Sequence, residues 1–358
     1  IHDAGFDAAW EIDLFGRTRR SVEGAEARME ATQADAYGVL ISVTAEVARS
    51  YLTLRGAQRE LAAREASVQT LQQTLDLVRR RFDAGDNARA DVDSAQARLA
   101  AADAGIPAIR ARLRASALGL GVLLGAPPER ELALVDTIAA EISLTPVPVG
   151  KRADLLRRRP DVRAAERRLA ASTADIGVAT AELFPKLTIG AGGGFQALDS
   201  GDLFQSASQV FSIMPLISWR VFDGGRVRAE IRASELRQQQ AALAYEQAVL
   251  AALGDAERAL SNYYLNLDAV QRHGVALEAA RRSYAHAQTR FKLGDIALTD
   301  LLAEERVLRD GEDAYVRAHS TTAVDLVAMF EALGGGWDAR TSAADVHGSA
   351  ADTQRPSI

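Results

Sequence analysis

Apolar side chains recur at every seventh position along two long stretches of this sequence. No proline interrupts residues 16–82, where a continuous helix would be roughly 100 Å long. A sustained seven-residue period under-winds helices into left-handed coiled coils, so the pattern predicts long antiparallel helical hairpins, with a kink at Pro107. The first stretch contains Leu40, Val47, Leu54, Leu61, Val68, Leu75 and Phe82, then Val92, Leu99, Ile106, Leu113 and Leu120. The second contains Val249, Ala256, Tyr263, Val270, Leu277, Tyr284 and Phe291, then Leu301, Leu308, Tyr315, Thr322 and Met329.

The two stretches are copies of one unit. Residues 10–125 and 219–334 share landmarks at a constant offset of 209 without gaps, as in Trp10 and Trp219 or Gly16 and Gly225. A repeat this long lies outside the usual solenoid periods. It therefore predicts two similar structural units placed side by side.

Both copies carry the motif Arg-Phe-x-x-Gly-Asp, with a further aspartate five residues later. We expect its glycine to end the incoming helix in a left-handed conformation, and the polar residue that follows to cap the next helix. A generic hairpin does not require a shared motif, so the tips are expected to share a docking or closing role. The motif residues are Arg81, Phe82, Gly85, Asp86 and Asp91 in the first copy and Arg290, Phe291, Gly294, Asp295 and Asp300 in the second; the expected caps are Asp86 or Asn87, and Asp295.

Alternating apolar and polar residues predict strands ahead of the long helices. Lys186–Phe195 and Phe211–Val221 each have the length of a tilted membrane strand, about ten residues, and Gln196–Gln209 between them is typical of an exposed loop. Phe6–Phe15 is a third candidate. Aromatic residues near the segment ends fit an interfacial belt. A two-stranded ribbon packed on the helices, outside any membrane, is an alternative that the pattern leaves open.

Composition narrows the function classes. With 358 residues and a formal net charge of -6, the chain is long enough for one large or two modest domains and is not a nucleic-acid binder by charge. Cysteine is absent, which excludes disulfides, thiolate catalysis and zinc-thiolate sites in this sequence. No run of eighteen apolar residues predicts a transmembrane helix. The histidines lack ligand spacing, and neither a nucleophile elbow nor a phosphate loop is present, so we expect no enzyme, no metal and no cofactor.

Several independent motifs closely resemble the outer membrane factor (TolC-like) family, and within it the NodT-type branch of multidrug-efflux outer membrane lipoproteins. The resemblance covers residues 1–337 in unbroken order. The motifs are Trp10-Glu11-Ile12-Asp13-Leu14-Phe15-Gly16-Arg17, Asp154-Leu155-Leu156-Arg157-Arg158-Arg159-Pro160-Asp161-Val162, Ala174-Asp175-Ile176-Gly177, Leu183-Phe184-Pro185-Lys186-Leu187 and Ala332-Leu333-Gly334-Gly335-Gly336-Trp337.

The resemblance implies a mainly α fold with a small β part. Three protomers would share one twelve-stranded outer-membrane barrel, continued by an α-helical tunnel through the periplasm. The implied division is a transmembrane strand (1–15), a helical hairpin with its tip near 82–91 (16–126), an inter-repeat linker in the equatorial region (127–150), helices opening the second repeat (151–185), two transmembrane strands with an extracellular loop at 196–209 (186–222), a second hairpin with its tip near 291–300 (223–337) and a disordered tail (338–358).

The resemblance also assigns roles to residues. The two tips would contact a periplasmic adaptor, and the helix starts beyond them would constrict the pore. Ala303 stands where relatives often carry a gate aspartate, so any charge pairing would join Arg306 to Asp300, Glu304 or Glu305, across protomers because helix spacing favours neither Asp300 nor Glu304. Ordinary surface charges are the alternative. The gate candidates are Asp91, Thr299, Asp300, Ala303, Glu304 and Arg306, and the membrane-strand aromatics are Phe195, Phe211 and Trp219.

The implied function is that of an outer-membrane channel in a tripartite efflux system of a Gram-negative bacterium. It would be a passive exit duct for compounds expelled by an inner-membrane RND-type pump through a periplasmic adaptor (membrane fusion protein). The implied partners are copies of the chain, the adaptor, the pump and outer-membrane lipid, without nucleic acid. The channel of a type I protein secretion system and a soluble coiled-coil adaptor or spacer are the alternatives. The sequence is also expected to be an N-terminally truncated fragment, because a sister strand to Phe6–Phe15 is missing.

Overall fold

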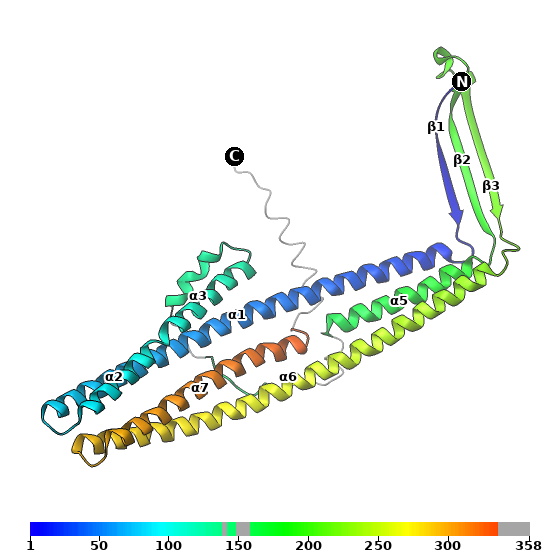
Figure 1. Ribbon diagram of the computed structural model, residues 1–358. Coiled ribbons are helices and arrows are strands. Elements are labelled where there is room, and N and C mark those ends of the chain that lie inside the picture. The colour runs from blue at the N-terminus through cyan, green and yellow to red at the C-terminus, as the bar shows by residue number, and fades with distance from the viewer. Residues whose placement is uncertain (138–141, 148–157, 336–358) are drawn as a thin grey trace. The chain divides into compact units, whose positions relative to one another are not determined.

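The computed structural model describes residues 1–137, 142–147 and 158–335 (Figure 1). Within these residues the chain forms two compact units, one from residues 1–38 and 160–251 and the other from residues 39–159 and 252–358. The expected tail at 338–358 lies outside the described residues, as do parts of the expected linker (138–141 and 148–150) and residues 151–157 of the segment expected to open the second repeat.

The first unit contains a three-stranded antiparallel sheet in the order β1-β2-β3. Its strands are β1 (His2–Ile12), β2 (Lys186–Ala197) and β3 (Gln209–Ser218). Three helical segments complete the unit: α5 (Pro160–Ala181), the first part of α1 (Arg17–Asp83) and the first part of α6 (Arg226–Leu293). The loop between β2 and β3 contains two short 3-10 helices, η2 (Ser200–Asp202) and η3 (Ser206–Ser208).

Strand register confirms that the sheet has one apolar and one more polar face. Trp10 pairs with Ile189, which pairs with Pro215, so their side chains share a face. Every second residue follows the same rule. The apolar face carries Phe6, Ala8, Trp10 and Ile12 of β1, Leu187, Ile189, Ala191 and Phe195 of β2, and Phe211, Ile213, Pro215 and Ile217 of β3.

The bounds of all three strands differ from the sequence prediction, since β1 begins at His2, β2 extends to Ala197 and β3 begins at Gln209. Two strands also end earlier than predicted. β1 ends at Ile12 rather than Phe15, because the Asp13 carboxylate accepts the backbone N–H groups of Thr18 (3.1 Å) and Arg19 (2.9 Å) and thereby starts α1. β3 ends at Ser218. Trp219 therefore lies beyond the strand, where its indole N–H donates to the Leu183 carbonyl at 3.0 Å.

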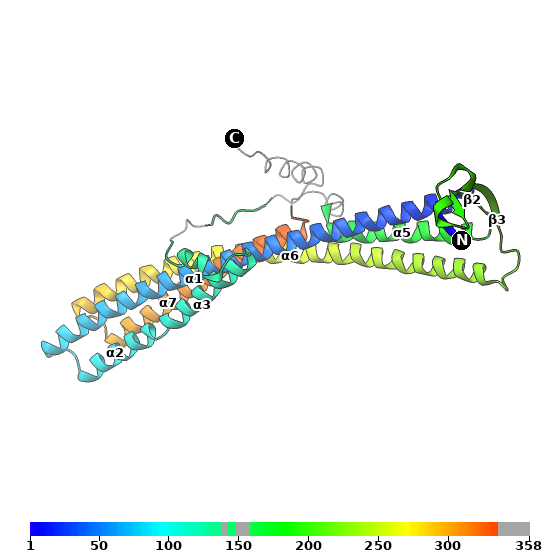
Figure 2. The same ribbon diagram turned by 90° about the horizontal axis from the view of Figure 1, so that it is seen from above.

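The second unit consists of helical hairpins (Figure 2). One is built from α1 beyond Gly38, α2 (Arg89–Asp103) and α3 (Ile106–Leu123), and the other from α6 beyond Ala251 and α7 (Leu298–Ala332). A 3-10 helix, η1 (Pro128–Asp136), follows α3. The predicted interruption at Pro107 is confirmed, since Pro107 lies in the first turn of α3. No helix in the described ranges combines the length and apolar character that crossing a membrane would need.

The predicted seam is buried more fully in the second copy than in the first. All of its positions from Ala256 to Phe291 are buried, and so are Leu301, Thr322 and Met329. In α1 only Leu54 and Leu75 of the predicted set are buried, while Leu40 is 57% exposed. Five alanines of α1 are also buried (Ala27, Ala31, Ala34, Ala45 and Ala57), and its two other large buried apolar side chains are Leu71 and Val78. These two occupy the second apolar position of the heptad, three residues after the predicted seam, which a coiled coil also requires.

Ion pairs and one apolar cluster join the two copies within the second unit. Arg64 of α1 contacts Asp313 of α7 at 2.8 Å, and Arg49 contacts Glu331 at 2.7 Å. Near the tips a single core collects side chains from all four helices: Leu75 and Val78 of α1, Val92 and Ala95 of α2, Tyr284, Ala287 and Phe291 of α6, and Leu298, Leu301 and Leu302 of α7. The predicted side-by-side arrangement of the repeats is therefore confirmed in this unit.

Repeated glycines mark the same backbone features in both copies. The pairs Gly16 and Gly225, Gly85 and Gly294, and Gly125 and Gly334 are each 209 residues apart, and all six have positive φ. Other residues rarely adopt this conformation. The repeat detected in the sequence therefore preserves helix ends as well as helix faces.

Candidate channel wall and hairpin tips

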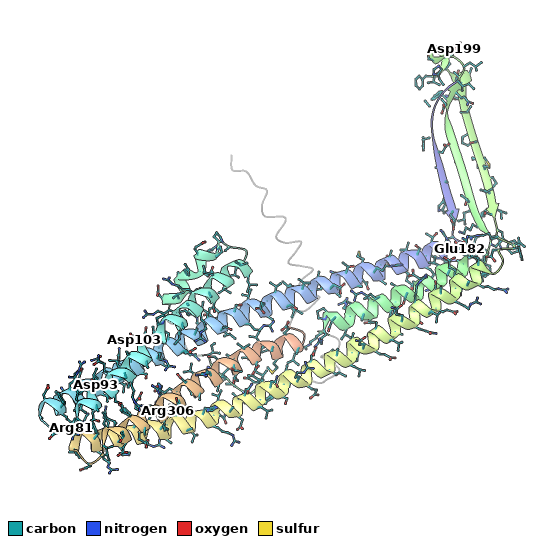
Figure 3. The ribbon with its side chains drawn as sticks, in the orientation of Figure 1. Arg81, Asp93, Asp103, Glu182, Asp199 and Arg306 are labelled. Carbon is teal, nitrogen blue, oxygen red and sulfur yellow. The ribbon has the colours of Figure 1, made fainter. Side chains whose placement is uncertain are left out.

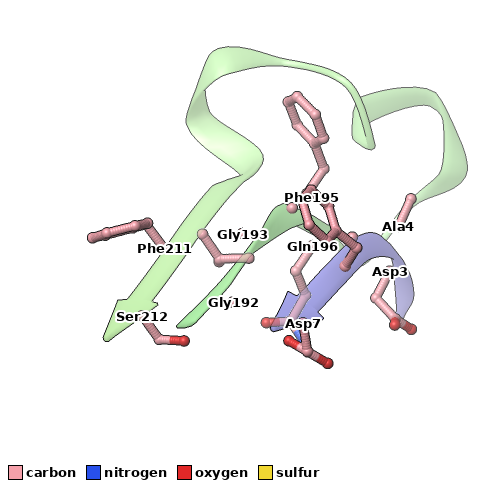
Figure 4. A pocket seen from close by; sticks show the side chains of 13 residues that line it. Asp3, Ala4, Asp7, Gly192, Gly193, Phe195, Gln196, Phe211 and Ser212 are labelled. Carbon is pink, nitrogen blue, oxygen red and sulfur yellow. The ribbon is translucent and has the colours of Figure 1, made fainter. Parts of the chain in front are cut away.

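The polar face of the sheet carries acidic residues on β1 and mostly glycine on β2, whereas β3 contributes Val210, Met214 and Leu216 beside Ser212. Asp7 of β1, Gly192 of β2 and Ser212 of β3 are consecutive partners across the sheet. A Cβ at position 192 would lie 2.6 Å from the Asp7 carboxylate and 3.1 Å from the Ser212 hydroxyl. Figure 4 shows Asp3, Asp7 and Ser212 pointing to one side of the strands, while Phe195 points to the other. The part of this face formed by β1 and β2 is therefore suited to water.

The opposite face exposes large apolar side chains that no other part of the described chain covers. Phe6 is 81% exposed and Phe211 is 78% exposed, and Trp10, Ile213 and Ile217 are also exposed. Apolar surface of this extent normally marks a protein interface or a lipid contact. Together, the two faces match a sheet that separates an aqueous side from a lipid side.

The shared tip motif has a structural explanation. At the first tip Gly85 N–H donates to the Phe82 carbonyl (3.0 Å) and Asp86 N–H donates to the Arg81 carbonyl (2.8 Å). The second tip repeats this pattern, with Gly294 N–H donating to the Phe291 carbonyl (3.0 Å) and Asp295 N–H donating to the Arg290 carbonyl (2.9 Å). Both are Schellman motifs, as the glycine predicted. The motif thus encodes a turn, and its repetition does not require a shared docking role.

The prediction that Asp86 or Asn87 and Asp295 cap the next helices is wrong. The N-cap residues are Ala88 and Ala297, whose side chains cannot accept a hydrogen bond. Instead, the Asp91 carboxylate accepts the Ala88 N–H at 3.1 Å, and the Asp300 carboxylate accepts the Ala297 N–H at 3.3 Å. An acidic side chain in the first turn accepts a hydrogen bond from a backbone N–H that has no partner within the helix. Its negative charge also interacts favourably with the positive end of the helix dipole. The second aspartate of the motif therefore starts each helix.

The two tips differ in their side-chain contacts. A guanidinium nitrogen of Arg81 donates to the Phe291 carbonyl at 2.6 Å, and the guanidinium lies 4.8 Å from the centre of the Phe291 ring. Phe291 is only 1% exposed. Its repeat equivalent Phe82 is half-buried, and Arg290, the equivalent of Arg81, is exposed. Figure 3 shows Arg81 at its tip. Arg81 therefore joins the two tips, while Arg290 faces outward.

The structure places Asp91 in the first turn of α2 and the other gate candidates along the first turns of α7. Thr299 and Ala303 are exposed, and Glu304 accepts a hydrogen bond from the Ser283 hydroxyl at 2.7 Å. Within the protomer, Arg306 (labelled in Figure 3) pairs with Asp310 at 3.6 Å, one helical turn later. Asp310 was not among the acidic partners expected for Arg306, although the i, i+4 spacing of this pair is visible in the sequence.

Glu305 is a further residue that sequence reasoning did not resolve. Its side chain is buried, with one carboxylate oxygen unpartnered and Arg309 at 3.9 Å from the other. Burial raises the pKa of Glu305 above its ordinary value, against the opposing effect of Arg309 and Arg98. Glu305 is adjacent in sequence to the exposed Arg306, so its burial could be recognised only once the apolar core near the tips was known. No cluster of three or more potential metal ligands forms in the described ranges.

We expect Glu305→Gln to remove one pH dependence of stability. A carboxyl whose folded-state pKa is raised stabilises the fold most at low pH, and this contribution is lost as pH rises from about 4.5 through the folded pKa. The amide cannot ionise, so the variant should unfold at a higher temperature than the parent at pH 8 and at a similar temperature at pH 4. Melting of the purified trimer at both pH values tests this. An equal shift at pH 4 and pH 8 would mean that ionisation of Glu305 is irrelevant.

Comparison with known proteins agrees with this geometry. The outer membrane efflux protein family matches residues 2–126 and 152–335. A pyoverdine export outer membrane protein of Pseudomonas putida, OpmQ, is 30% identical over 338 residues, which cover 94% of this chain and 71% of the relative. Nodulation protein T of Rhizobium leguminosarum bv. trifolii is 31% identical over 342 residues, covering 92% and 71%. The solved outer-membrane channel OprN superposes with a TM-score of 0.85 at 39% identity, covering 93% of this chain and 75% of OprN.

The chain belongs to the outer membrane efflux protein family. The predicted fold class, function and location are thereby confirmed: it is an outer-membrane channel component of an efflux system, it extends into the periplasm of a Gram-negative bacterium, and its fold is TolC-like. The family consists of channels and not of enzymes. Its members are homotrimers that work with efflux pumps.

Proposed function

We propose that three copies of this chain form one exit duct, with the polar face of each sheet lining the lumen and the apolar face toward lipid. The main support for this proposal is that the outer edges of β1 and β3 have no hydrogen-bonded neighbour among the described strands. Open strand edges are not tolerated in lipid. Twelve strands require four from each protomer, of which the described residues supply three.

We further propose that the hairpin tips contact a periplasmic adaptor, which connects the duct to an inner-membrane pump of the RND type. Arg290 and Asp295 are exposed at the second tip, and Asp86 is exposed at the first. We propose that the duct transports small organic molecules, because one relative is named as a pyoverdine export protein. The duct itself supplies no energy and moves what the pump delivers.

Single cysteines provide a direct test of the adaptor contact. The chain contains no cysteine, so Asp295→Cys would introduce one unique thiol at each second tip. With a thiol-directed photo-crosslinker, we expect this variant to capture the co-expressed adaptor of a tripartite pump. We also expect the variant itself to migrate as a trimer in electrophoresis. Glu230→Cys, exposed near the start of α6, is the matched control. Equal capture at both positions, or none at residue 295, would contradict a contact at the tips.

We propose that the starts of α2 and α7 constrict the pore. The candidates remain Asp91, Thr299, Asp300, Ala303, Glu304 and Arg306. Asp91 and Asp300 also start their helices through backbone hydrogen bonds. Arg306 is therefore the charge best placed to act between protomers, because its pairing with Asp310 is exposed and contributes only about 0 to 1 kcal/mol.

Arg306→Ala is expected to raise the open-channel conductance at matched voltage without changing stability by more than about 0.5 kcal/mol. Arg272→Ala is the control, because Arg272 forms an equally exposed i, i+4 pair with Asp268 on α6. Single-channel recording in planar bilayers compares both variants with the parent. Unchanged conductance in Arg306→Ala would remove this residue from the gate.

A further inference from the structure

An open pocket lies where the sheet meets the helices of the first unit. Its volume is about 300 Å³, and its lining includes Glu182, Trp219, Arg220, Phe222, Asp223 and Arg228. Glu182 marks this place in Figure 3. Apart from Trp219, which was expected among the membrane-strand aromatics, these residues have no role in the proposed duct or at the tips.

The pocket lining contains two arginines and two carboxylates, and cations beside it give the region a small excess of positive charge. Glu182 contacts three cations: Lys186 at 2.5 Å, Arg220 at 2.6 Å and Arg17 at 3.3 Å. The hydrogen bond from Lys186 and the nearby positive charges hold the pKa of Glu182 below its ordinary value, so it is ionised at neutral pH. Glu11 lies 3.8 Å from Arg17 as well, so two carboxylates face three cations here, which leaves a local surplus of one positive charge.

The start of α6 adds the cation Arg228 and the carboxylate of Asp223, so the surplus stays at one positive charge. Arg228 is exposed and forms no ion pair within the described ranges. The helix N-terminus itself is already occupied, because the Asp223 carboxylate accepts the N–H groups of Gly225 (2.9 Å) and Val227 (2.8 Å). An anion in the pocket would therefore contact guanidinium groups rather than helix N–H groups.

Exposed apolar side chains surround these cations. Phe222 is 92% exposed, and Val221 and Trp219 are exposed as well. They follow β3 directly, so they continue from the strand whose Phe211, Ile213 and Ile217 form part of the lipid-facing surface. Aromatic residues beside basic residues are typical of the level of the lipid headgroups.

We propose that this pocket binds the headgroup of an anionic phospholipid in the periplasmic leaflet of the outer membrane, with Arg220 and Arg228 facing the phosphate and Phe222 among the acyl chains. A free phosphate ion would use the cations but leave the apolar residues without a role. The leaflet follows from the fold, because this end of the sheet continues into the helices that enter the periplasm. The proposal depends on the location of the protein and not on the identity of pump or adaptor.

Lipid retention by the purified trimer tests the proposal. Native mass spectrometry after exposure to equal amounts of phosphatidylglycerol and phosphatidylcholine should show a preference for phosphatidylglycerol. Arg220→Gln/Arg228→Gln should reduce this preference by about 30-fold, since two interfacial cations are lost, while Lys186 and Arg17 still pair with Glu182. Arg232→Gln/Arg237→Gln, which changes two exposed arginines further along α6, should leave the preference unchanged.

Three outcomes would overturn the proposal. The first is equal retention of both lipids by the parent, and the second is an undiminished preference in Arg220→Gln/Arg228→Gln. The third is displacement of phosphatidylglycerol by an equal concentration of glycerol phosphate, which would define a site for free anions. Phe222→Ser tests the apolar part of the site separately. A stable trimer that loses phosphatidylglycerol faster supports the proposal, whereas loss of the trimer would contradict the placement of Phe222 among the acyl chains.

Discussion

Replacing Gly194 with valine is expected to prevent assembly of the channel. Gly194 of β2 pairs with Gly5 of β1, and a Cβ at position 194 would lie 2.5 Å from both the Ala4 carbonyl oxygen and the Gly5 Cα. Both obstacles are backbone atoms, so no rotamer change relieves the overlap. The strands must separate, and in lipid each lost backbone hydrogen bond costs several kcal/mol. We expect at least a tenfold loss of heat-resistant trimer in the outer-membrane fraction.

Gly193→Val is the matched control for this prediction. Position 193 is adjacent on the same strand but faces the opposite side of the sheet, and a Cβ there would meet no atom within 4 Å. The control should assemble at parental levels, since valine suits a strand. Comparable trimer yields from Gly194→Val and Gly193→Val would show that the close approach of β1 and β2 is not required.

Phe291→Ala is expected to loosen both hairpin tips. Phe291 is fully buried in the core that joins α1, α2, α6 and α7, and its ring lies beneath the Arg81 guanidinium. Removing a buried phenylalanine ring typically costs about 3–5 kcal/mol. Amide hydrogen exchange in residues 284–305 should accelerate by at least a hundredfold, and the closed channel should show frequent openings in bilayer recordings.

Phe82→Ala is the natural comparison, because Phe82 occupies the equivalent position of the first repeat. Its side chain is only half-buried against the same core. We expect less than half the loss of stability and correspondingly smaller changes in exchange. If the two variants behaved alike, the difference in burial between the tips would have no energetic consequence.

Much of the fold followed from local rules that the sequence displays. Period-seven spacing identified the helices, and period-two spacing identified the strand faces, because both depend on backbone geometry alone. The tip glycines were predictable for the same reason, since residues with positive φ are nearly always glycine. The helix caps were missed because the residue directly after the turn was expected to cap, whereas Asp91 and Asp300 reach back from inside the first turn.

The candidate site was less predictable. The sequence presented the two tips as equivalent, but only Arg81 spans the gap to the other tip and only Phe291 is fully buried. Likewise, the buried Glu305 and the exposed Arg306 are neighbours in a charged run whose two sides cannot be distinguished without the partner helices. Burial depends on what packs against a residue, and that partner is distant in sequence.

By itself, the sequence determined a tandem pair of coiled-coil hairpins, strands with one apolar and one polar face, and membership of a channel family, because each rests on periodicity or on contiguous motifs. The tertiary structure alone decided which copy of each motif is buried, which arginine joins the tips, and how three cations gather around Glu182. Repeat symmetry holds for backbone turns, which are local. It fails for side-chain environments, since the two copies pack against different neighbours.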